Sequence, residues 1–173
     1  TQLRFGRLRL QNVVGAETLP LQVPLLAQYW SGTAYVTNTL DSCTSLDRQH
    51  IALDFSGGGA LAACDTAVSA PSVVLSSGTA TIPLAAPGGA NTGSVLLTPQ
   101  LRSPATGSYC TAAGGAYVAA SSAALPYLLG RWQDGVDSDS DPSSANDDNP
   151  AARAAFGVYG SQPRQFIFFR ETY

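Results

Sequence analysis

The chain has no lysine and no methionine, and it holds only one histidine and three cysteines in 173 residues. All nine basic residues are arginines that are scattered along the chain, and the net charge is −3, so nucleic acid is not an expected partner. No apolar run approaches the roughly 20 residues that cross a bilayer, so no membrane span is predicted. A single histidine without a Cys-x-x-Cys pair also argues against a structural zinc site.

Signatures of catalysis are missing as well. His50 lies between Asp47 and Asp54 and is the usual kind of general base, but no Gly-x-Ser-x-Gly elbow or other nucleophile context accompanies it. The alternation around His50 instead places it on the outward face of a strand. The glycine-rich segments 57–59 and 87–89 adjoin predicted strands rather than helices, so they are turns and not phosphate loops. We therefore expect that the protein is not an enzyme, and no catalytic residue is assigned.

What is present favours β-structure in one domain. The apolar fraction is 45%, the charged fraction is 12%, and the chain has 17 glycines and 11 prolines, a profile of short strands and many turns. We expect residues 1–173 to form a single domain, because no internal segment reads as a linker. Since the chain starts at Thr1 without an initiator methionine, we expect it to be a processed or C-terminal piece of a longer exported protein.

Alternating apolar residues and turn signals locate the strands. A slip of the alternation at Gly6 predicts a β-bulge, and Pro24 predicts an edge position or a bulge for its strand. The fold class expected is all-β: an antiparallel, immunoglobulin-like (Ig-like) β-sandwich with long Gly/Ala/Ser loops, above all over residues 102–124. The predicted strands span residues 3–10, 20–30, 33–38, 49–55, 73–75, 79–84, 94–98, 151–159 and 165–173.

The cysteines Cys43, Cys64 and Cys110 favour an exported protein with one disulfide. We predict the pair Cys43–Cys64, because both residues flank the same short strand pair, and a bridge of that span would stabilise the fold by about 3 kcal/mol. Cys110 would then be a free thiol or would bridge to another chain. The alternative is a cytosolic protein with three buried, reduced cysteines.

The most distinctive segment is an acidic loop that holds six of the twelve acidic residues. The spacing of Asp137, Asp139 and Asp141 offers carboxylates at alternate positions, as calcium loops do, which makes Ca²⁺ the expected cofactor. Pro142 stands where the helix-loop-helix motif needs glycine, and a solvated acidic loop is the alternative. The predicted metal ligands are Asp134, Asp137, Asp139, Asp141, Asp147 and Asp148.

Aromatic residues offer another candidate surface. Aromatics at this frequency commonly form the core and rim of a sandwich, but an exposed set could line a sugar-binding face. The candidates are Tyr29, Trp30, Tyr35, Tyr109, Tyr117, Tyr127 and Trp132.

Several segments together resemble a known family. They are residues 7–25, Ala27-Gln-Tyr-Trp30, Tyr35-Val-Thr-Asn-Thr39, Asp41-Ser-Cys-Thr44, the acidic loop, residues 150–159 and the terminal Phe169-Arg-Glu-Thr-Tyr173. In this order they resemble the C-terminal domain of the MSHA pilus biogenesis protein MshQ and related large bacterial surface proteins. The resemblance implies an exported domain, extracellular or on the cell surface, and brings no catalytic residues. It also implies that the cysteine of Asp41-Ser-Cys-Thr44 pairs with a later one of the Cys64 type.

These observations predict a structural or adhesive β-domain of a pilus- or filament-type surface assembly. Partners would be copies of the chain (a homopolymer) or other pilus or adhesin subunits. Subunits could join by β-strand addition through the terminal strands, although pairing within one subunit is an equal alternative. The predicted contact residues are Leu3, Phe5, Leu8, Leu10, Phe166 and Phe168. The alternative function, from another class, is a calcium-dependent carbohydrate-binding module.

Overall fold

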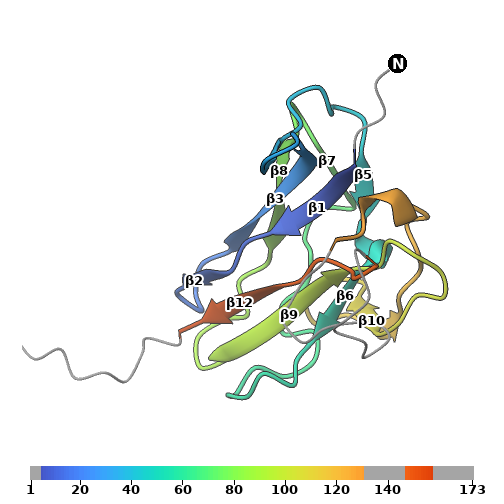
Figure 1. The fold of residues 1–173 in the computed structure, drawn as a ribbon. Helices are drawn as coiled ribbons and strands as arrows, with labels where there is room; N and C mark the ends of the chain where they lie inside the picture. Colours follow the sequence, from blue (N-terminus) through green and yellow to red (C-terminus); the bar gives the residue numbers. More distant parts are fainter. Residues whose placement is uncertain (1–4, 131–146, 158–173) are drawn as a thin grey trace, which may run out of the picture.

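A computed structural model describes residues 5–130 and 147–157 of the chain. Its strands form two main sheets that face each other, together with two short two-stranded pairs (Figure 1). The prediction of a β-sandwich is confirmed. The described residues contain no helix long and apolar enough to cross a membrane. The strands are β1 (Gly6–Leu10), β2 (Val13–Gly15), β3 (Leu21–Trp30), β4 (Tyr35–Thr37), β5 (Ser45–Asp47), β6 (Ile51–Asp54), β7 (Ser72–Val74), β8 (Thr79–Leu84), β9 (Gly93–Pro99), β10 (Ser108–Cys110), β11 (Tyr117–Ala119) and β12 (Ala152–Phe156).

The first main sheet is built on β3, the longest strand. β1 pairs with one edge of β3, while β8 and β4 pair with successive parts of its other edge, all antiparallel. The second main sheet has the order β2-β12-β9-β6, in which β2 runs parallel to β12. The pair β2-β12 is the parallel pair of this otherwise antiparallel sheet, because the chain crosses from the first sheet to the second between β1 and β2. The two remaining pairs are β5-β7 and β10-β11.

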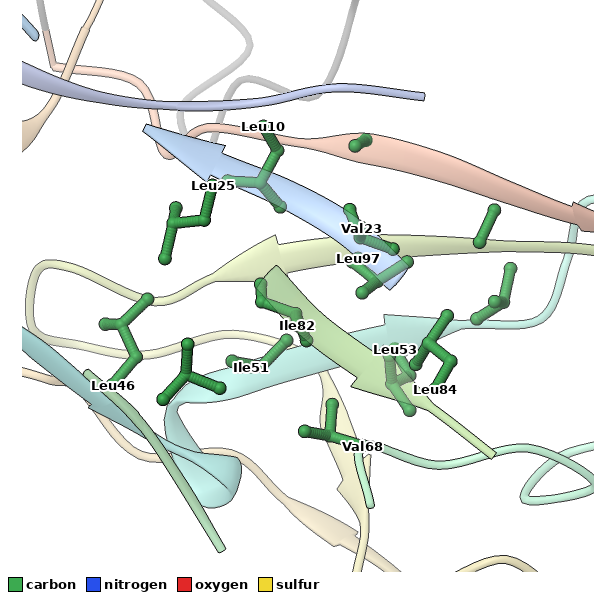
Figure 2. Packing of buried hydrophobic residues seen from close by; sticks show 14 of the residues in the cluster. Leu10, Val23, Leu25, Leu46, Ile51, Leu53, Val68, Ile82, Leu84 and Leu97 are labelled. Atoms are coloured by element: carbon green, nitrogen blue, oxygen red, sulfur yellow. The ribbon is translucent and has the colours of Figure 1, made fainter. Parts of the chain in front are cut away.

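The core fills the space between the main sheets. Alternate residues of β3 and β8 point toward alternate residues of β9 and β6, so side chains from all four strands meet (Figure 2). Fully burying a leucine or isoleucine side chain stabilises the folded state by about 1.5–3 kcal/mol. This face-to-face burial is therefore what orders the two sheets relative to each other. Its most buried members include Leu8, Val23, Leu25, Ile51, Leu53, Ile82, Leu84, Leu97 and Phe156.

Two local predictions for the first sheet are wrong. The pairing of β1 with β3 runs without interruption from Gly6 to Leu10, so there is no bulge at Gly6. Pro24 lies in the central strand and not at an edge. Its carbonyl accepts a hydrogen bond from the Gln11 amide (3.1 Å), so the side of Pro24 that lacks an N–H faces the point where β1 ends. A central strand tolerates proline here because the ladder between β1 and β3 stops at the pair Leu10–Leu25 and needs no N–H from Pro24.

The predicted strand 49–55 begins later than expected. Arg48–His50 form a 3₁₀ turn, η1, and His50 Nδ1 accepts a hydrogen bond from the Asp47 amide (3.2 Å). The strand starts at Ile51, and Ala52, which the alternation would place on the same outward face as His50, is buried. The β10-β11 hairpin covers this outer side of β6, since β10 packs against β6 and the Tyr117 hydroxyl donates to the Leu53 carbonyl (2.6 Å).

The disulfide joins Cys64 to Cys110, and Cys43 is an exposed free thiol. The predicted Cys43–Cys64 pair is therefore wrong, although one disulfide is present as expected. Cys64 and Cys110 are both buried and their Cα atoms lie 5.5 Å apart, whereas Cys43 lies on an exposed turn before β5. Cys43 is closer to Cys64 in sequence than Cys110 is, but it is not its partner. The long loop after β6 brings Cys64 to the β10-β11 hairpin, which contains Cys110.

Shortening Leu8 should show that β1 belongs to the core of its own subunit. Leu8 is fully buried, so Leu8→Ala should lower the free energy of unfolding by about 2–5 kcal/mol in a urea titration. The matched control is Arg9→Ala, an exposed neighbour on the same strand, which should change it by no more than about 0.5 kcal/mol. A Leu8→Ala variant as stable as the wild type would mean that β1 does not complete this sheet in solution.

The disulfide assignment predicts different effects for the three cysteines. Replacing Cys64 and Cys110 together by serine should cost about 4 kcal/mol of stability, as expected for closing a loop with 46 residues of sequence separation. Cys43→Ser should leave stability nearly unchanged, because that thiol is exposed. Peptide mapping without reductant should recover a Cys64–Cys110 peptide, and a Cys43–Cys64 peptide would contradict the structure.

Candidate recognition site

The outer face of the first sheet carries a group of aromatic side chains where β3 ends. Trp30 is the last residue of β3 and lies opposite Tyr35, the first residue of β4. Their rings meet edge to face, with centroids 5.2 Å apart and an interplanar angle of 63°. The Trp30 amide donates to the Phe5 carbonyl (2.8 Å), which places Phe5 beside Trp30. Phe5, Trp30 and Tyr35 are called the aromatic patch below.

This patch remains accessible to a partner. Phe5 is 48% and Trp30 45% exposed, whereas the inward residues of the same strands, such as Leu8 and Ala27, are at most 2% exposed. The alternation of the strands explains the difference, because residues at odd and even positions point to opposite faces. The patch is therefore built on the outer side of a sheet whose inner side is anchored in the core.

Arg7 fixes the patch from the neighbouring strand. Its guanidinium carbon lies 3.6 Å from the centroid of the Tyr35 ring, and its Nε donates to Gln28 Oε1 (3.0 Å). Partial burial lowers the pKa of Arg7 from its usual value, and the charge interaction with Tyr35 opposes this change. Neither Arg7 nor Gln28 was among the predicted functional residues. The available signal was that Arg7 and Gln28 occupy outward positions, and that Gln28 lies next to Tyr29 in sequence.

Three other predicted aromatics, Tyr109, Tyr117 and Tyr127, do not extend the patch. Tyr117 lies opposite Cys110 in the β10-β11 pair and packs edge to face against Phe55. Tyr109, one position before Cys110, therefore points to the opposite side of this hairpin. Tyr127 is 67% exposed in the 3₁₀ turn η2 (Pro126–Leu128), while Trp132 lies outside the described residues. The predicted aromatic set is thus divided among separate surfaces.

Two of the six predicted metal ligands, Asp147 and Asp148, belong to the described residues. Asp134, Asp137, Asp139 and Asp141 lie outside the described residues. Asp148 is buried, and its backbone pairs with Gly130. In the part of the chain that the structure describes, no group of three potential metal ligands comes together.

Among the predicted metal ligands, Asp147 has side-chain contacts that bear on cation binding. Its Oδ2 lies 3.6 Å from Nη1 of Arg102. Its Oδ1 is buried and has no hydrogen-bond partner among the described residues. A buried carboxylate oxygen without a partner is costly, so this atom is the one feature of the described structure that fits the predicted cation.

The predicted subunit-contact residues are also divided. Leu8 and Leu10 are buried in the core of their own chain, and Phe5 belongs to the aromatic patch. Leu3, Phe166 and Phe168 lie outside the described residues. Within the described residues β1 has only one strand neighbour, β3, so it forms an edge of the first sheet.

The Asp41-Ser-Cys-Thr44 motif, which follows β4, forms a network of hydrogen bonds around Asp41. Asp41 Oδ1 accepts hydrogen bonds from the amides of Cys43 (3.2 Å) and Thr44 (3.0 Å), and Oδ2 accepts one from the Thr44 hydroxyl (2.8 Å). The Asp41 carbonyl also accepts from the amide of Gly78 (2.7 Å). The motif thereby connects the segment after β4 to the turn between β7 and β8.

Asp41 should contribute to acid sensitivity. Burial alone would raise the pKa of Asp41, but the hydrogen bonds from Thr44 and Cys43 outweigh it and hold that pKa below its usual value. A lowered folded-state pKa gives stability that is present above the unfolded-state pKa of about 3.9 and is lost as the pH falls below it. Urea unfolding at pH 7 and pH 3 should therefore show a smaller acid-induced loss in Asp41→Asn than in the wild type. Equal losses would show that Asp41 has an unperturbed pKa.

A protein-family model described as DUF6701, fourth domain, matches residues 4–172. Neither the curated proteins nor the solved structures gave a match.

Proposed function

We propose that this chain, which belongs to the family DUF6701, fourth domain, is an extracellular structural or adhesive β-domain of a bacterial pilus- or filament-type surface assembly. The family description, which counts domains, fits a module within a longer protein. The resemblance to the C-terminal domain of MshQ supports a place in pilus biogenesis. The buried Cys64–Cys110 disulfide supports an oxidising location outside the cytoplasm, where such bonds persist.

The aromatic patch is the observation that carries this proposal. Tryptophan, tyrosine and arginine are the residues that dominate binding energy at protein interfaces. Here Trp30, Tyr35 and Arg7 occur together, and contacts with Tyr35 and Gln28 restrain the long Arg7 side chain before any partner arrives. Restraint in the free protein reduces the entropy that is lost on binding. An exposed, ordered aromatic group on a sheet surface is therefore suited to contact a neighbouring subunit.

Strand addition fits the same region. β1 is an edge of the first sheet among the described residues, and Phe5, which precedes it, belongs to the patch. A strand from a neighbouring subunit could pair with the edge of β1 that has no strand neighbour among the described residues, while its side chains contact Trp30. In this arrangement β1 accepts a strand and remains in its own core, rather than being donated to another subunit.

Removal of the tryptophan side chain tests the subunit contact. Trp30→Ala should weaken self-association of the purified chain about tenfold or more in sedimentation velocity, because a central aromatic residue of an interface would be lost. The control is Leu19→Ala, an apolar residue that is 60% exposed and precedes the opposite end of β3. A wild-type chain that stays monomeric at all concentrations, or a Trp30→Ala variant that associates equally well, would contradict the proposal.

The second candidate function is a calcium-dependent carbohydrate-binding module. It is favoured by Asp147 of the acidic loop, whose buried Oδ1 has no hydrogen-bond partner among the described residues. Under this proposal Ca²⁺ should raise the melting temperature relative to EGTA, and Asp147→Asn should reduce that increase. A glycan array should then show binding with Ca²⁺ that chelation removes, and binding that is absent in both conditions would eliminate this candidate.

A further inference from the structure

A surface hollow of about 430 Å³ lies where η1, the start of β7 and the β10-β11 hairpin meet. Its lining includes Asp47 and Gln49 around η1 and Ser72 of β7. It also includes Tyr109 of β10 and Thr111, the residue directly after β10. It is separate from the aromatic patch, whose residues come from β3, β4 and the segment before β1. Its volume falls within the range of about 300–1,000 Å³ that is usual for small-ligand sites.

Arg48 holds the walls of this hollow together. Its guanidinium donates to the carbonyl oxygens of Ser69 (3.1 Å), Ala70 (3.4 Å) and Thr111, and its amide donates to the Pro71 carbonyl (2.9 Å). The segment before β7 is thereby tied to the residue after Cys110, which the disulfide fixes to Cys64. A hollow with such cross-links keeps its shape when it is empty, and this lowers the cost of binding.

The orientation of Tyr109 follows from the hairpin. Cys110 points into the core, so Tyr109 points to the other side and lines the hollow. Around it lie a carboxylate (Asp47), an amide (Gln49) and a hydroxyl (Ser72), which together supply both donors and acceptors. The Thr111 hydroxyl accepts from the Ala116 amide (3.0 Å), and its proton can still be donated to a ligand.

This combination of groups selects among ligand classes. A purely apolar ligand would leave the polar groups of the lining unpaired, which is costly. An anion is disfavoured because Asp47 is negative and each guanidinium nitrogen of Arg48 already donates to a backbone carbonyl. A metal ion would find only one carboxylate in this lining. A neutral molecule with many hydroxyl groups and a flat apolar face meets none of these objections.

We propose that this hollow binds a neutral sugar residue of a glycan, without a metal ion. The apolar face of the sugar packs on the Tyr109 ring, and its hydroxyl groups bond with Asp47, Gln49 and Ser72. The inference rests on the proposed adhesive role, which it deepens by naming a receptor class. It differs from the calcium-dependent alternative because its residues lie outside the acidic loop.

The test is an NMR titration of the ¹⁵N-labelled full chain in EGTA with the methyl glycosides of glucose, galactose, mannose and N-acetylglucosamine, one at a time. At least one probe should give saturable shifts centred on the amides of Ser72, Tyr109 and Thr111. Tyr109→Ala should weaken that binding about tenfold. Tyr109→Phe should retain most of it because the ring remains, and Tyr127→Ala, which removes a tyrosine 67% exposed elsewhere, should leave it unchanged.

A second variant keeps the test decisive if Tyr109→Ala unfolds the protein. Asp47→Asn retains the shape of the side chain but removes its charge, so it should weaken binding while the melting temperature stays near that of the wild type. The proposal is overturned if no probe gives saturable shifts, if the shifts lie elsewhere, or if Asp47→Asn binds the probe as tightly as the wild type does. Because the titration requires no assembly and the sedimentation assay requires no sugar, either proposal can fail without the other.

Discussion

The burial of apolar side chains between the two main sheets is the constraint on which the rest of the structure depends. β3 and β8 present one inner face, β9 and β6 present the other, and neither sheet could bury these residues alone. Because successive strand residues alternate between faces, fixing the inner positions also fixes the outer ones. Arg7, Gln28, Trp30 and Tyr35 are held on the outer surface by the same pairing that buries Leu8 and Ala27.

The sequence predicted the parts of the fold that depend on local periodicity. The inward residues of β3 could be identified because Val23, Leu25 and Ala27 alternate with more exposed residues over a long strand. The position of β3 within the sheet could not be predicted, because Pro24 suggested an edge strand. Proline is tolerated in this central strand because the pairing with β1 ends beside Pro24. Where that pairing ends depends on the tertiary structure and not on the local sequence.

Features that depend on distant contacts were predicted poorly. Ala52 is buried because a hairpin much later in the chain covers it, and no local pattern encodes that cover. The cysteine pairing failed for the same reason, since Cys64 meets Cys110 across a sequence separation of 46 residues. The aromatic residues were recognised as candidates, but their division among separate surfaces follows from strand register. Tyr109 and Tyr117 face opposite ways because Tyr117 lies opposite Cys110.

The two outward features suit the proposed function in different ways. The aromatic patch is an exposed surface with the residue types of protein interfaces, whereas the hollow at Tyr109 is concave and combines an aromatic ring with several polar groups. Both are held by rigid elements, the patch by β1, β3 and β4 and the hollow by Arg48 and the disulfide. A domain with one surface for neighbouring subunits and one for a receptor would be both structural and adhesive.

The central claim, that this domain works outside the cell in a surface assembly, is tested most directly by immunogold electron microscopy of intact cells that produce the protein. With an antibody against residues of the described domain, the account predicts gold particles on surface filaments of unpermeabilised cells. Labelling that is seen only after permeabilisation, distributed through the cytoplasm, would contradict it.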